Sequence, residues 1–290
     1  MPKIRLKKIL IFYKTSVYRH CLSKKKSVKS ISTDSEHLMR LKETHNNHYE
    51  SLQVVETALK KKGVHYKKAK RGQYIDFANY NFIISIGGDG TLLEAARHMK
   101  NQLLLGVNSD PKWSIGRLCS TSSKDFSKDL DSILRGQFRI QILNRLQLKI
   151  KGCPDSINIL NDILICHKNP AAMSRYRITC KGKSEEQKSS GVWISTAAGS
   201  TGAIHSADAK SLPLGSKKYA YKARELYTNK KTKYRFRGGA LTPPETIKFT
   251  SLMKDGIIYA DGCHKKIPFP IGKKATLSLS HEPLRVIKIK

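Results

Sequence analysis

The stretch Phe82-Ile83-Ile84-Ser85-Ile86-Gly87-Gly88-Asp89-Gly90-Thr91 decides the fold. Its first five residues are almost all apolar and mostly β-branched, which is typical of a strand buried on both faces. The glycines that follow allow unusual backbone angles and a close approach to a ligand. A short helix is expected next at residues 92–99, and another strand at residues 103–107. This order of strand, helix and strand predicts a parallel, Rossmann-like sheet.

The N-terminal segment is strongly basic. The first 33 residues contain ten Lys or Arg and no acidic residue, which is similar to a transit peptide. However, Ile9-Leu10-Ile11-Phe12-Tyr13 is a compact apolar run close to the start, and no small-residue cleavage site follows a long apolar core. We therefore expect residues 9–13 to be the first strand of the mature fold. The location that follows is cytoplasmic, with a mitochondrial one as the alternative.

A long helix is expected between the first strand and the glycine loop. Thr33 and Glu36 have the spacing of a capping box, and Gly63 is suited to end the helix. His45 and His48 fill places in its apolar stripe. They lack the H-E-x-x-H pattern of zinc proteases, so we expect them to pack at the boundary of the core rather than to bind a metal.

Composition limits the classes of protein that need to be considered. The 290 residues are 39% hydrophobic and 27% charged, which indicates a globular protein. No run approaches the roughly 18 apolar residues of a membrane span. Lys and Arg number 55 against 22 acidic residues, so the formal net charge is +33. Such a chain attracts phosphorylated metabolites, nucleotides, nucleic acids and anionic lipids, although a compositional bias toward lysine would give the same charge.

The cysteines give no disulfide pattern. No C-x-x-C pair occurs, and the six residues are too dilute for a stapled secreted domain. They are Cys21, Cys119, Cys153, Cys166, Cys180 and Cys263. We expect free thiols in a reducing compartment.

The C-terminal half of the chain predicts strands. Apolar runs typical of strands occupy residues 138–150, 157–166, 176–180 and 246–253. Asp255-Gly256 lies between the last of these and the run 257–260, which is a hairpin signal. Residues 275–280 and 284–289 are two further strands, whose placement the pattern does not decide. A β-rich second domain is therefore expected.

Gly87-Gly88-Asp89-Gly90-Thr91 is the strongest candidate for a site of chemistry. Backbone N–H groups of a glycine loop and of a helix N-terminus favour the oxygens of a phosphate. A carboxylate in such a loop would repel phosphate, so Asp89 is better suited to accept a proton from an attacking hydroxyl or to bind a metal-bound water. The competing interpretation is a turn and a helix cap. The run is neither a G-x-G-x-x-G nor a Walker A sequence.

Two weaker signals follow in the β-rich half. Gly199-Ser200-Thr201-Gly202 comes after the strand-like residues 192–196, and small residues there suit a backbone that approaches a ligand. Asn161-Asp162 interrupts an apolar run. Polar side chains in a buried strand need partners, which a local bulge or the ribose hydroxyls of a ligand could supply.

Together these elements resemble the ATP-dependent NAD kinase family. The similarity covers roughly residues 80–275 in the family's order. The matching elements are Gly87 to Glu94 for the GGDGT loop, Asn161-Asp162 for the Asn-Glu or Asn-Asp motif, residues 195–206 for the S-T-x-x-G-S-T segment, and Asp261-Gly262 for the late Asp-Gly turn. GGDGT alone is shared with diacylglycerol-type lipid kinases and phosphofructokinases.

The resemblance implies an architecture and a reaction. The fold would be an N-terminal α/β domain, Rossmann-like and of the phosphofructokinase type, at residues 1–125, and a β-rich domain at residues 126–271. Residues 272–290 would pack back on the first domain. The reaction would be Mg-ATP-dependent phosphorylation of the 2′-hydroxyl of the NAD adenosine ribose to give NADP. The family's habit predicts a homodimer or homotetramer.

The resemblance also implies roles for individual residues. Asp89 would be catalytic, and Gly87, Gly88, Gly90 and Thr91 would bind the phosphates of ATP. No protein ligand is assigned to Mg²⁺, which would bind through the ATP phosphates. The residues implied in NAD binding are Asp89, Gly90, Asn161, Asp162, Thr201, Gly202, Ala203 and Ser206.

This chain departs from the bacterial pattern at two places. Ser190 precedes Gly191 where many members have an aspartate, and Ala203 stands where they have a tyrosine. Residues 106–111 and 114–119 look more like the divergent mitochondrial-type branch. The departures concern contacts to the nucleoside more than the reaction.

Two alternatives stay open at this point. A diacylglycerol-type lipid kinase would share the GGDGT loop. A nucleic-acid-binding protein would use residues 217–237, where nine Lys or Arg alternate with five aromatic residues, although a loop whose tyrosines pack underneath explains the same pattern. No RRM, KH or helix-turn-helix signature occurs, so we expect no specific nucleic-acid partner. We also expect no membrane partner, because no apolar run is long enough for a span.

Overall fold

The computed structural model describes residues 8–23, 34–228, 233–262 and 265–289. Contacts divide the chain into two units, Met1–Gln141 with Leu284–Lys290 and Ile142–Pro283. The domain limits predicted from the sequence stay a proposal beside this division. No helix within the described ranges is both long and apolar enough to cross a membrane.

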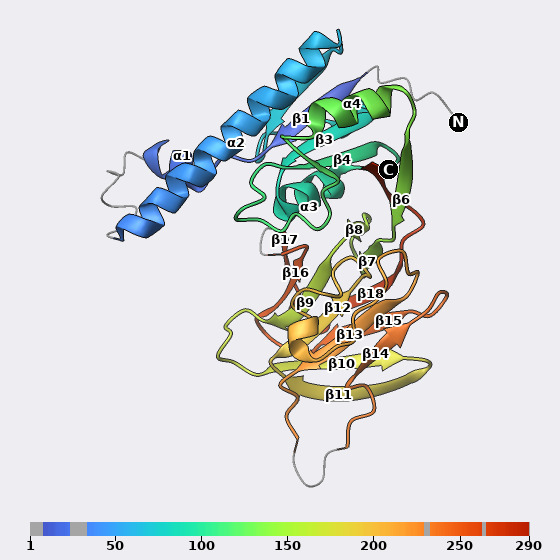
Figure 1. The fold of residues 1–290 in the computed structure, drawn as a ribbon. Helices are drawn as coiled ribbons and strands as arrows, with labels where there is room; N and C mark the ends of the chain where they lie inside the picture. The colour runs from blue at the N-terminus through green and yellow to red at the C-terminus, as the bar shows by residue number, and fades with distance from the viewer. Residues whose placement is uncertain (1–7, 24–33, 229–232, 263–264, 290) are drawn as a thin grey trace. The chain divides into compact units, whose positions relative to one another are not determined.

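The first unit is built on a mainly parallel sheet (Figure 1). Its order is β2-β1-β3-β4-β19-β6, and β5 pairs with β4. The strands are β1 (Ile9–Tyr13), β2 (Tyr66–Lys70), β3 (Phe82–Gly87), β4 (Leu103–Asn108), β5 (Thr121–Ser122), β6 (Phe138–Leu143) and β19 (Leu284–Ile289). β1 pairs in parallel with β2 and β3, and β4 pairs in parallel with β3 and β19. The predicted parallel, Rossmann-like sheet is confirmed.

Helices cover both faces of this sheet, as Figure 1 shows. The core on one face joins α2 (Ser35–Lys61) and α4 (Phe126–Leu134) to alternate strand residues such as Ile9 and Ile84. α3 (Asp89–His98) lies against the other face, where Leu92 packs beside Gly106. Because successive strand side chains point to opposite faces, the apolar runs of β1, β3 and β4 serve both layers.

The long helix matches its prediction in extent. α2 ends just before Gly63, whose φ of 64° is in the left-handed region that favours glycine. Its N-cap is Asp34, whose carboxylate accepts a hydrogen bond from the Glu36 N–H at 2.9 Å. Thr33, the residue expected at the cap, lies outside the described residues. The short helices are α1 (Val17–Ser23), η2 (Phe77–Asn79) and η3 (His205–Ala207).

The second unit is a sandwich of two six-stranded sheets, ordered β11-β10-β15-β18-β7-β8 and β14-β13-β12-β9-β16-β17. Side chains of both sheets form one buried cluster that includes Leu148, Ile165, Ile194 and Phe249. The strands of the first sheet are β7 (Leu146–Ile150), β8 (Ile157–Ile159), β10 (Ser174–Cys180), β11 (Lys183–Ser189), β15 (Ile247–Ser251) and β18 (Lys274–Leu279). Those of the second are β9 (Asp162–His167), β12 (Gly191–Ser195), β13 (Tyr219–Arg224), β14 (Gly238–Leu241), β16 (Gly256–Ala260) and β17 (Lys265–Pro268). The predicted fold class, an α/β part followed by a β-rich part, is confirmed.

The hairpin predicted at Asp255-Gly256 is wrong. β15 pairs with β10 and β18, whereas β16 pairs with β9 and β17, so the two strands belong to opposite sheets. The connection passes from one sheet of the sandwich to the other. A side chain at Gly256 would clash with the Phe269 carbonyl oxygen, so this glycine permits close packing between strands rather than a tight turn.

The last two strands of the chain belong to different sheets. β18 joins a sheet of the second unit, and β19 adds to the sheet of the first. Only β19 therefore packs back on the N-terminal α/β part. The five described cysteines are free thiols, and Cys263 lies outside the described residues.

Candidate functional site

The glycine loop leaves β3 at the carboxyl end of the first sheet. Gly87 has a φ of 156°, and a Cβ there would clash with the Thr91 hydroxyl. Gly88 caps α3, and the space beside Gly90 is open. Parallel sheets bind ligands at this edge, and the first N–H groups of a helix have no partner within the helix. The loop is therefore built to receive anionic oxygens.

Asp89 is the first residue of α3 and is half-buried. Its Oδ2 accepts a hydrogen bond from the Arg117 N–H at 3.0 Å, and its Oδ1 accepts one from the Leu118 N–H at 2.8 Å. Each carboxylate oxygen has a further lone pair. The carboxylate is thus fixed in place by a second loop and keeps capacity to accept a proton.

That second loop, residues 108–119, packs over the glycine loop. Asn108 donates from Nδ2 to the Ser114 carbonyl at 2.8 Å, and a Cβ on Gly88 would clash with the Ser114 hydroxyl. Lys288 of β19 donates to the carbonyls of Leu118 (3.3 Å) and Cys119 (3.0 Å). Burial lowers the pKa of Lys288, and the neighbouring Cys119 and Asp89 partly oppose this. No sequence motif marks Lys288, because only the return of β19 brings it here.

His45 and His48 of α2 pack at the boundary of the core, as predicted. His48 is fully buried and bonds through its ring nitrogens to the Ser109 hydroxyl at 3.0 Å and the Lys14 carbonyl at 2.8 Å. Burial lowers its pKa to about 4, so it is neutral at physiological pH. His45 bonds to the Ser16 hydroxyl at 2.6 Å. In the described part of the chain, no three His, Cys, Asp or Glu side chains are grouped to hold a metal ion.

In the second unit, Asn161 and Asp162 lie at the break between β8 and β9. Asp261 accepts hydrogen bonds from the N–H of Leu160 at 3.1 Å and of Asn161 at 2.6 Å. Its own N–H donates to the Asp162 carbonyl at 2.9 Å. Asn161 Nδ2 donates to Asp162 Oδ2 at 3.0 Å. The late Asp-Gly turn therefore builds the Asn-Asp turn, although Asp261 was not among the predicted site residues.

The small-residue segment joins the same cluster. The Thr196 N–H donates to the Asn161 carbonyl at 3.0 Å, and the Ser195 hydroxyl donates to it at 3.2 Å. A Cβ on Gly199 would clash with this carbonyl, and one on Gly202 would lie 3.9 Å from Asp162 Oδ2. Thr201, Gly202, Ala203 and Ser206 are exposed. Three sequence motifs thus converge on one turn of the second unit.

Asp162 has unusual electrostatics. The residue is 5% exposed, and burial, with a smaller contribution from the Asp261 charge, raises its pKa to about 7. A carboxyl group that changes charge near neutral pH beside an exposed loop is a candidate for ligand binding.

The predicted site residues thus fall into two sets. Gly87, Gly88, Asp89, Gly90 and Thr91 lie together in the first unit. Those of the second unit, residues 161–162 and 201–206, lie around the turn held by Asp261.

The basic aromatic stretch does not form a row of exposed rings. Tyr219, Tyr221 and Phe236 belong to the buried core of the second unit, and residues 229–232 lie outside the described residues. Three of the five aromatic rings therefore pack underneath, which favours the interpretation of a packed loop over a base-stacking groove.

Comparison with known proteins gives relatives of similar length. The chain is 28% identical over 263 residues to a probable NADH kinase of Oryza sativa subsp. japonica, covering 83% of this chain and 81% of the relative. It is 29% identical over 279 residues to an NADH kinase of Arabidopsis thaliana, covering 82% and 83%. A shorter match joins it to the human mitochondrial NAD kinase 2, 27% identical over 164 residues, which are 51% of this chain and 37% of the relative. No family model matches the chain.

The chain is similar to NADH kinases over more than four-fifths of its length, and to NAD kinases over shorter stretches. Solved structures agree at the level of the fold. An NAD kinase from Archaeoglobus fulgidus in complex with ATP aligns with a TM-score of 0.67 at 18% identity, covering 98% of this chain and 93% of that one. A yeast NADH kinase complexed with NADH aligns with a TM-score of 0.70 at 15% identity, covering 98% and 84%. These similarities support a kinase, that is a phosphotransferase enzyme, rather than the lipid kinase or the nucleic-acid-binding alternative.

Proposed function

We propose that this protein transfers the γ-phosphoryl group of ATP to the 2′-hydroxyl of the NAD adenosine ribose and releases NADP and ADP. The observation that carries the proposal is the Gly87 to Asp89 loop. It places an anchored carboxylate beside a helix N-terminus, in a chain similar to NADH kinases over more than four-fifths of its length. NADH is the second acceptor to test. The rice and Arabidopsis relatives, which align with more than four-fifths of this chain, are both named NADH kinases.

Asp89 is proposed as the proton acceptor. In the reaction the 2′-oxygen forms a bond to the γ-phosphorus, the bond from that phosphorus to the bridging oxygen of ADP breaks, and the hydroxyl proton passes to the Asp89 carboxylate. The hydrogen bonds from Arg117 and Leu118 hold the carboxylate without using its remaining lone pairs. Phosphoryl transfer depends mostly on position and charge, so an anchored carboxylate suits it. Gly87, Gly88, Gly90 and Thr91 are proposed to bind the ATP phosphates.

The second unit is proposed to bind NAD. Asn161 offers an amide and Asp162 a carboxylate, and both are held by a turn with few degrees of freedom. Such groups bind ribose hydroxyls or the edge of adenine. Exposed residues Thr201, Gly202, Ala203 and Ser206 are proposed to line the same pocket, because their loop packs on the Asn161 carbonyl.

Mg²⁺ is proposed to arrive with ATP. The described residues offer no preformed cage for a metal, and Mg²⁺ commonly binds through substrate phosphates with one or two carboxylates. Asp89 is the carboxylate in position to contact such an ion or its water shell. When bound, the ion would neutralise charge on the transferred phosphoryl group. A homodimer or homotetramer, a cytoplasmic location and the absence of a nucleic-acid or membrane partner are further proposals that rest on the family resemblance.

A coupled assay tests the proposal. Purified protein is mixed with ATP, Mg²⁺ and NAD, and NADP is detected enzymatically, with NADH and diacylglycerol as parallel acceptors. We expect NADP to form and Asp89→Asn to abolish most of the rate. Asp129→Asn, which changes a half-buried aspartate on α4, is the matched control and should keep the rate. Transfer of label from ATP to diacylglycerol but not to NAD would refute the proposal.

A further inference from the structure

The second unit carries a groove on the outer face of the sheet that contains β7, β15 and β18. The groove encloses about 820 Å³, and those three strands and the loop 151–156 supply most of its lining. This volume lies in the range of small-molecule sites. None of the residues assigned above to ATP or NAD lines it. The groove is therefore a feature that the proposed reaction does not use.

The charge of the groove is strongly positive. Four exposed lysines face it against a single carboxylate, Asp155. They are Lys149, Lys151, Lys248 and Lys274. Within the described part of the chain none of the four takes part in an ion pair. Among the described residues, no ion pair relieves their mutual repulsion.

The strand register spaces these charges with hydroxyl groups. Thr276 of β18 lies opposite Lys248 on one neighbouring strand and opposite Lys149 on the other. In the next row Thr250 lies opposite Lys274. Lys248 and Lys149 are thus two strand spacings apart, about 10 Å. Alternation of lysine and threonine avoids like charges directly opposite each other, which would be destabilising, while every position keeps a hydrogen-bond donor.

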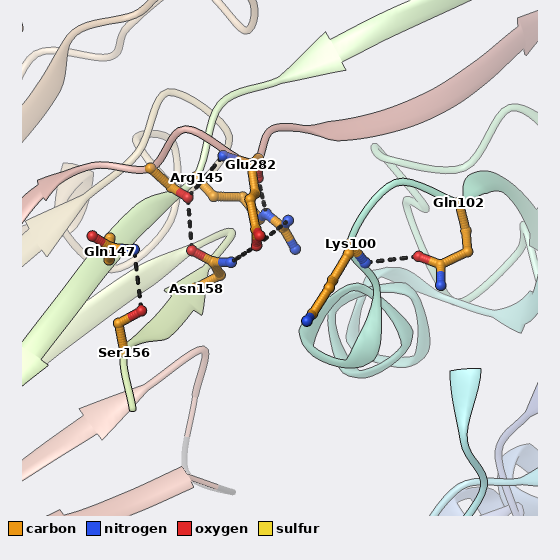
Figure 2. Close-up of polar contacts among 8 residues, drawn as sticks. Lys100, Gln102, Arg145, Gln147, Ser156, Asn158 and Glu282 are labelled. Atoms are coloured by element: carbon orange, nitrogen blue, oxygen red, sulfur yellow. Dashed lines mark hydrogen bonds and ion pairs between the residues drawn. The ribbon is translucent and has the colours of Figure 1, made fainter. Parts of the chain in front are cut away.

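A polar contact joins two parts of the lining. Gln147 donates from Nε2 to the Ser156 hydroxyl at 3.1 Å, which ties β7 to the loop at residues 151–156 (Figure 2). Beside it, Asn158 donates to Glu282 at 2.6 Å, as Figure 2 shows. Asn158 also accepts a hydrogen bond from the Ser280 hydroxyl at 2.7 Å. The first contact joins two residues of the lining, and the contacts of Asn158 lie just beyond it.

The lining selects the class of ligand. Lysine ammonium groups and threonine hydroxyls are donors suited to phosphate oxygens. The aromatic residue of the lining, Phe249, is 1% exposed and offers no face for stacking a base. A second copy of this chain, with a net charge of +33, would bring charge of the same sign. We propose that the groove binds a compact anion that carries three or more phosphate groups.

Calorimetry on the full chain tests this proposal. Inorganic tripolyphosphate and inositol hexakisphosphate are the probes, titrated at about 0.15 M salt with the nucleotide site filled by a non-hydrolysable ATP analogue and Mg²⁺. Orthophosphate, which spans only one lysine, should bind much more weakly. The two probes separate a linear from a cyclic arrangement of the phosphates, and saturable binding of either one supports the proposal.

Matched variants locate the binding. Lys149→Gln with Lys248→Gln and Lys274→Gln removes three charges from the groove. Lys168→Gln with Lys217→Gln and Lys254→Gln removes three from exposed positions of the same unit outside it. We expect the groove variant to lose about 10-fold or more in affinity, because three exposed charge contacts are lost, and the control to lose less than about 3-fold. NADP formation should be unchanged in both, which shows that they fold.

Three results would overturn the proposal. Equal losses in the two triple variants would mean that only the general field attracts the anion. Absence of saturable binding by either probe would mean that the groove binds no such ligand. Tighter binding of a single-stranded DNA of about 20 nucleotides, lost in the groove variant, would assign the groove to an extended nucleic acid instead.

Discussion

Asp261 holds the peptide group of Asn161 from 100 residues further along the chain, accepting its N–H at 2.6 Å. The second oxygen of the same carboxylate accepts the Leu160 N–H, and the Asp261 N–H returns a bond to the Asp162 carbonyl. Asp261 is 4% exposed and has a φ of 50°, a conformation that aspartate tolerates better than most residues. The Asn-Asp turn is therefore not self-supporting, and Asp261 is a positioning residue for it.

Asp261→Asn should raise KM for NAD about 10-fold with a smaller effect on kcat. An asparagine has one acceptor oxygen, so one of the two backbone N–H groups would face an amide NH₂ and the turn would loosen. The pKa of Asp162 should fall as well, because a neighbouring negative charge is removed. Steady-state kinetics and an NMR titration measure both effects. Asp255→Asn, at an exposed position, is the control, and an Asp261→Asn enzyme with unchanged KM would show that the bonds do not position the turn.

The raised pKa of Asp162 predicts how stability depends on pH. The pKa is about 7 in the folded chain, against 3.8 for an ordinary aspartate. Between these values the folded state keeps a proton that the unfolded state has released, so the free energy of unfolding falls as pH rises from about 4 to about 7. The contribution is at most about 4 kcal/mol, at about 1.4 kcal/mol per pH unit. Below pH 4 both states are protonated, and no penalty applies.

Asp162→Asn removes the loss of stability that the ionisation of Asp162 causes as pH rises. Relative to the unmodified protein, the variant should gain stability between pH 5 and pH 8, as measured by urea denaturation at both values. The same comparison for Asp255→Asn should show little change. A difference between Asp162→Asn and the parent that is constant with pH would mean that Asp162 is ionised throughout this range.

Much of the first unit could be predicted because its strands are buried on both faces. The strand predicted at residues 9–13 has the same bounds as β1, and the strand predicted at residues 82–86 lies within β3. Such short apolar runs are typical of strands buried on both faces, and the glycines after β3 mark where the chain must turn. The Asn-Asp and small-residue motifs were also visible, because polar and small residues interrupt apolar strands there.

Long-range pairing is what the sequence pattern did not reveal. The signal at Asp255-Gly256 is local. The two different sheets to which β15 and β16 belong are decided by their partners β10 and β9, about 70 to 100 residues earlier. For the same reason the sequence pattern does not mark Lys288. Its contact with residues 118–119 depends on the pairing of β19 with β4. Alternation within a strand reports which face is buried but not which neighbour covers it.

The exposed loop at Ala203 predicts relaxed selection among dinucleotides. Ser190 and Ala203 supply neither the charge nor the aromatic face that many family members have at these places. We expect NADH and deamino-NAD to be accepted alongside NAD. Ala203→Tyr should raise the preference for the best acceptor by about 3- to 10-fold, since an aromatic contact contributes roughly 0.5–1.5 kcal/mol. Ratios of kcat/KM measure this, and strict rejection of both analogues by the unmodified enzyme would contradict it.

The roles of Asp89 can be separated by kinetics. Asp89→Asn removes the charge and the proton acceptor, so kcat should fall by about 10²–10⁴-fold. It also leaves one of the N–H groups of Arg117 and Leu118 without an acceptor oxygen, which should lower Tm by a few degrees. If the residue only anchors the loop, KM for ATP should rise while kcat stays near that of the parent. If it accepts the proton, kcat should fall at saturating ATP and NAD. Retention of most of the NADP-forming rate at saturation would therefore leave Asp89 as an anchor for residues 117–118 and remove it from the chemical step.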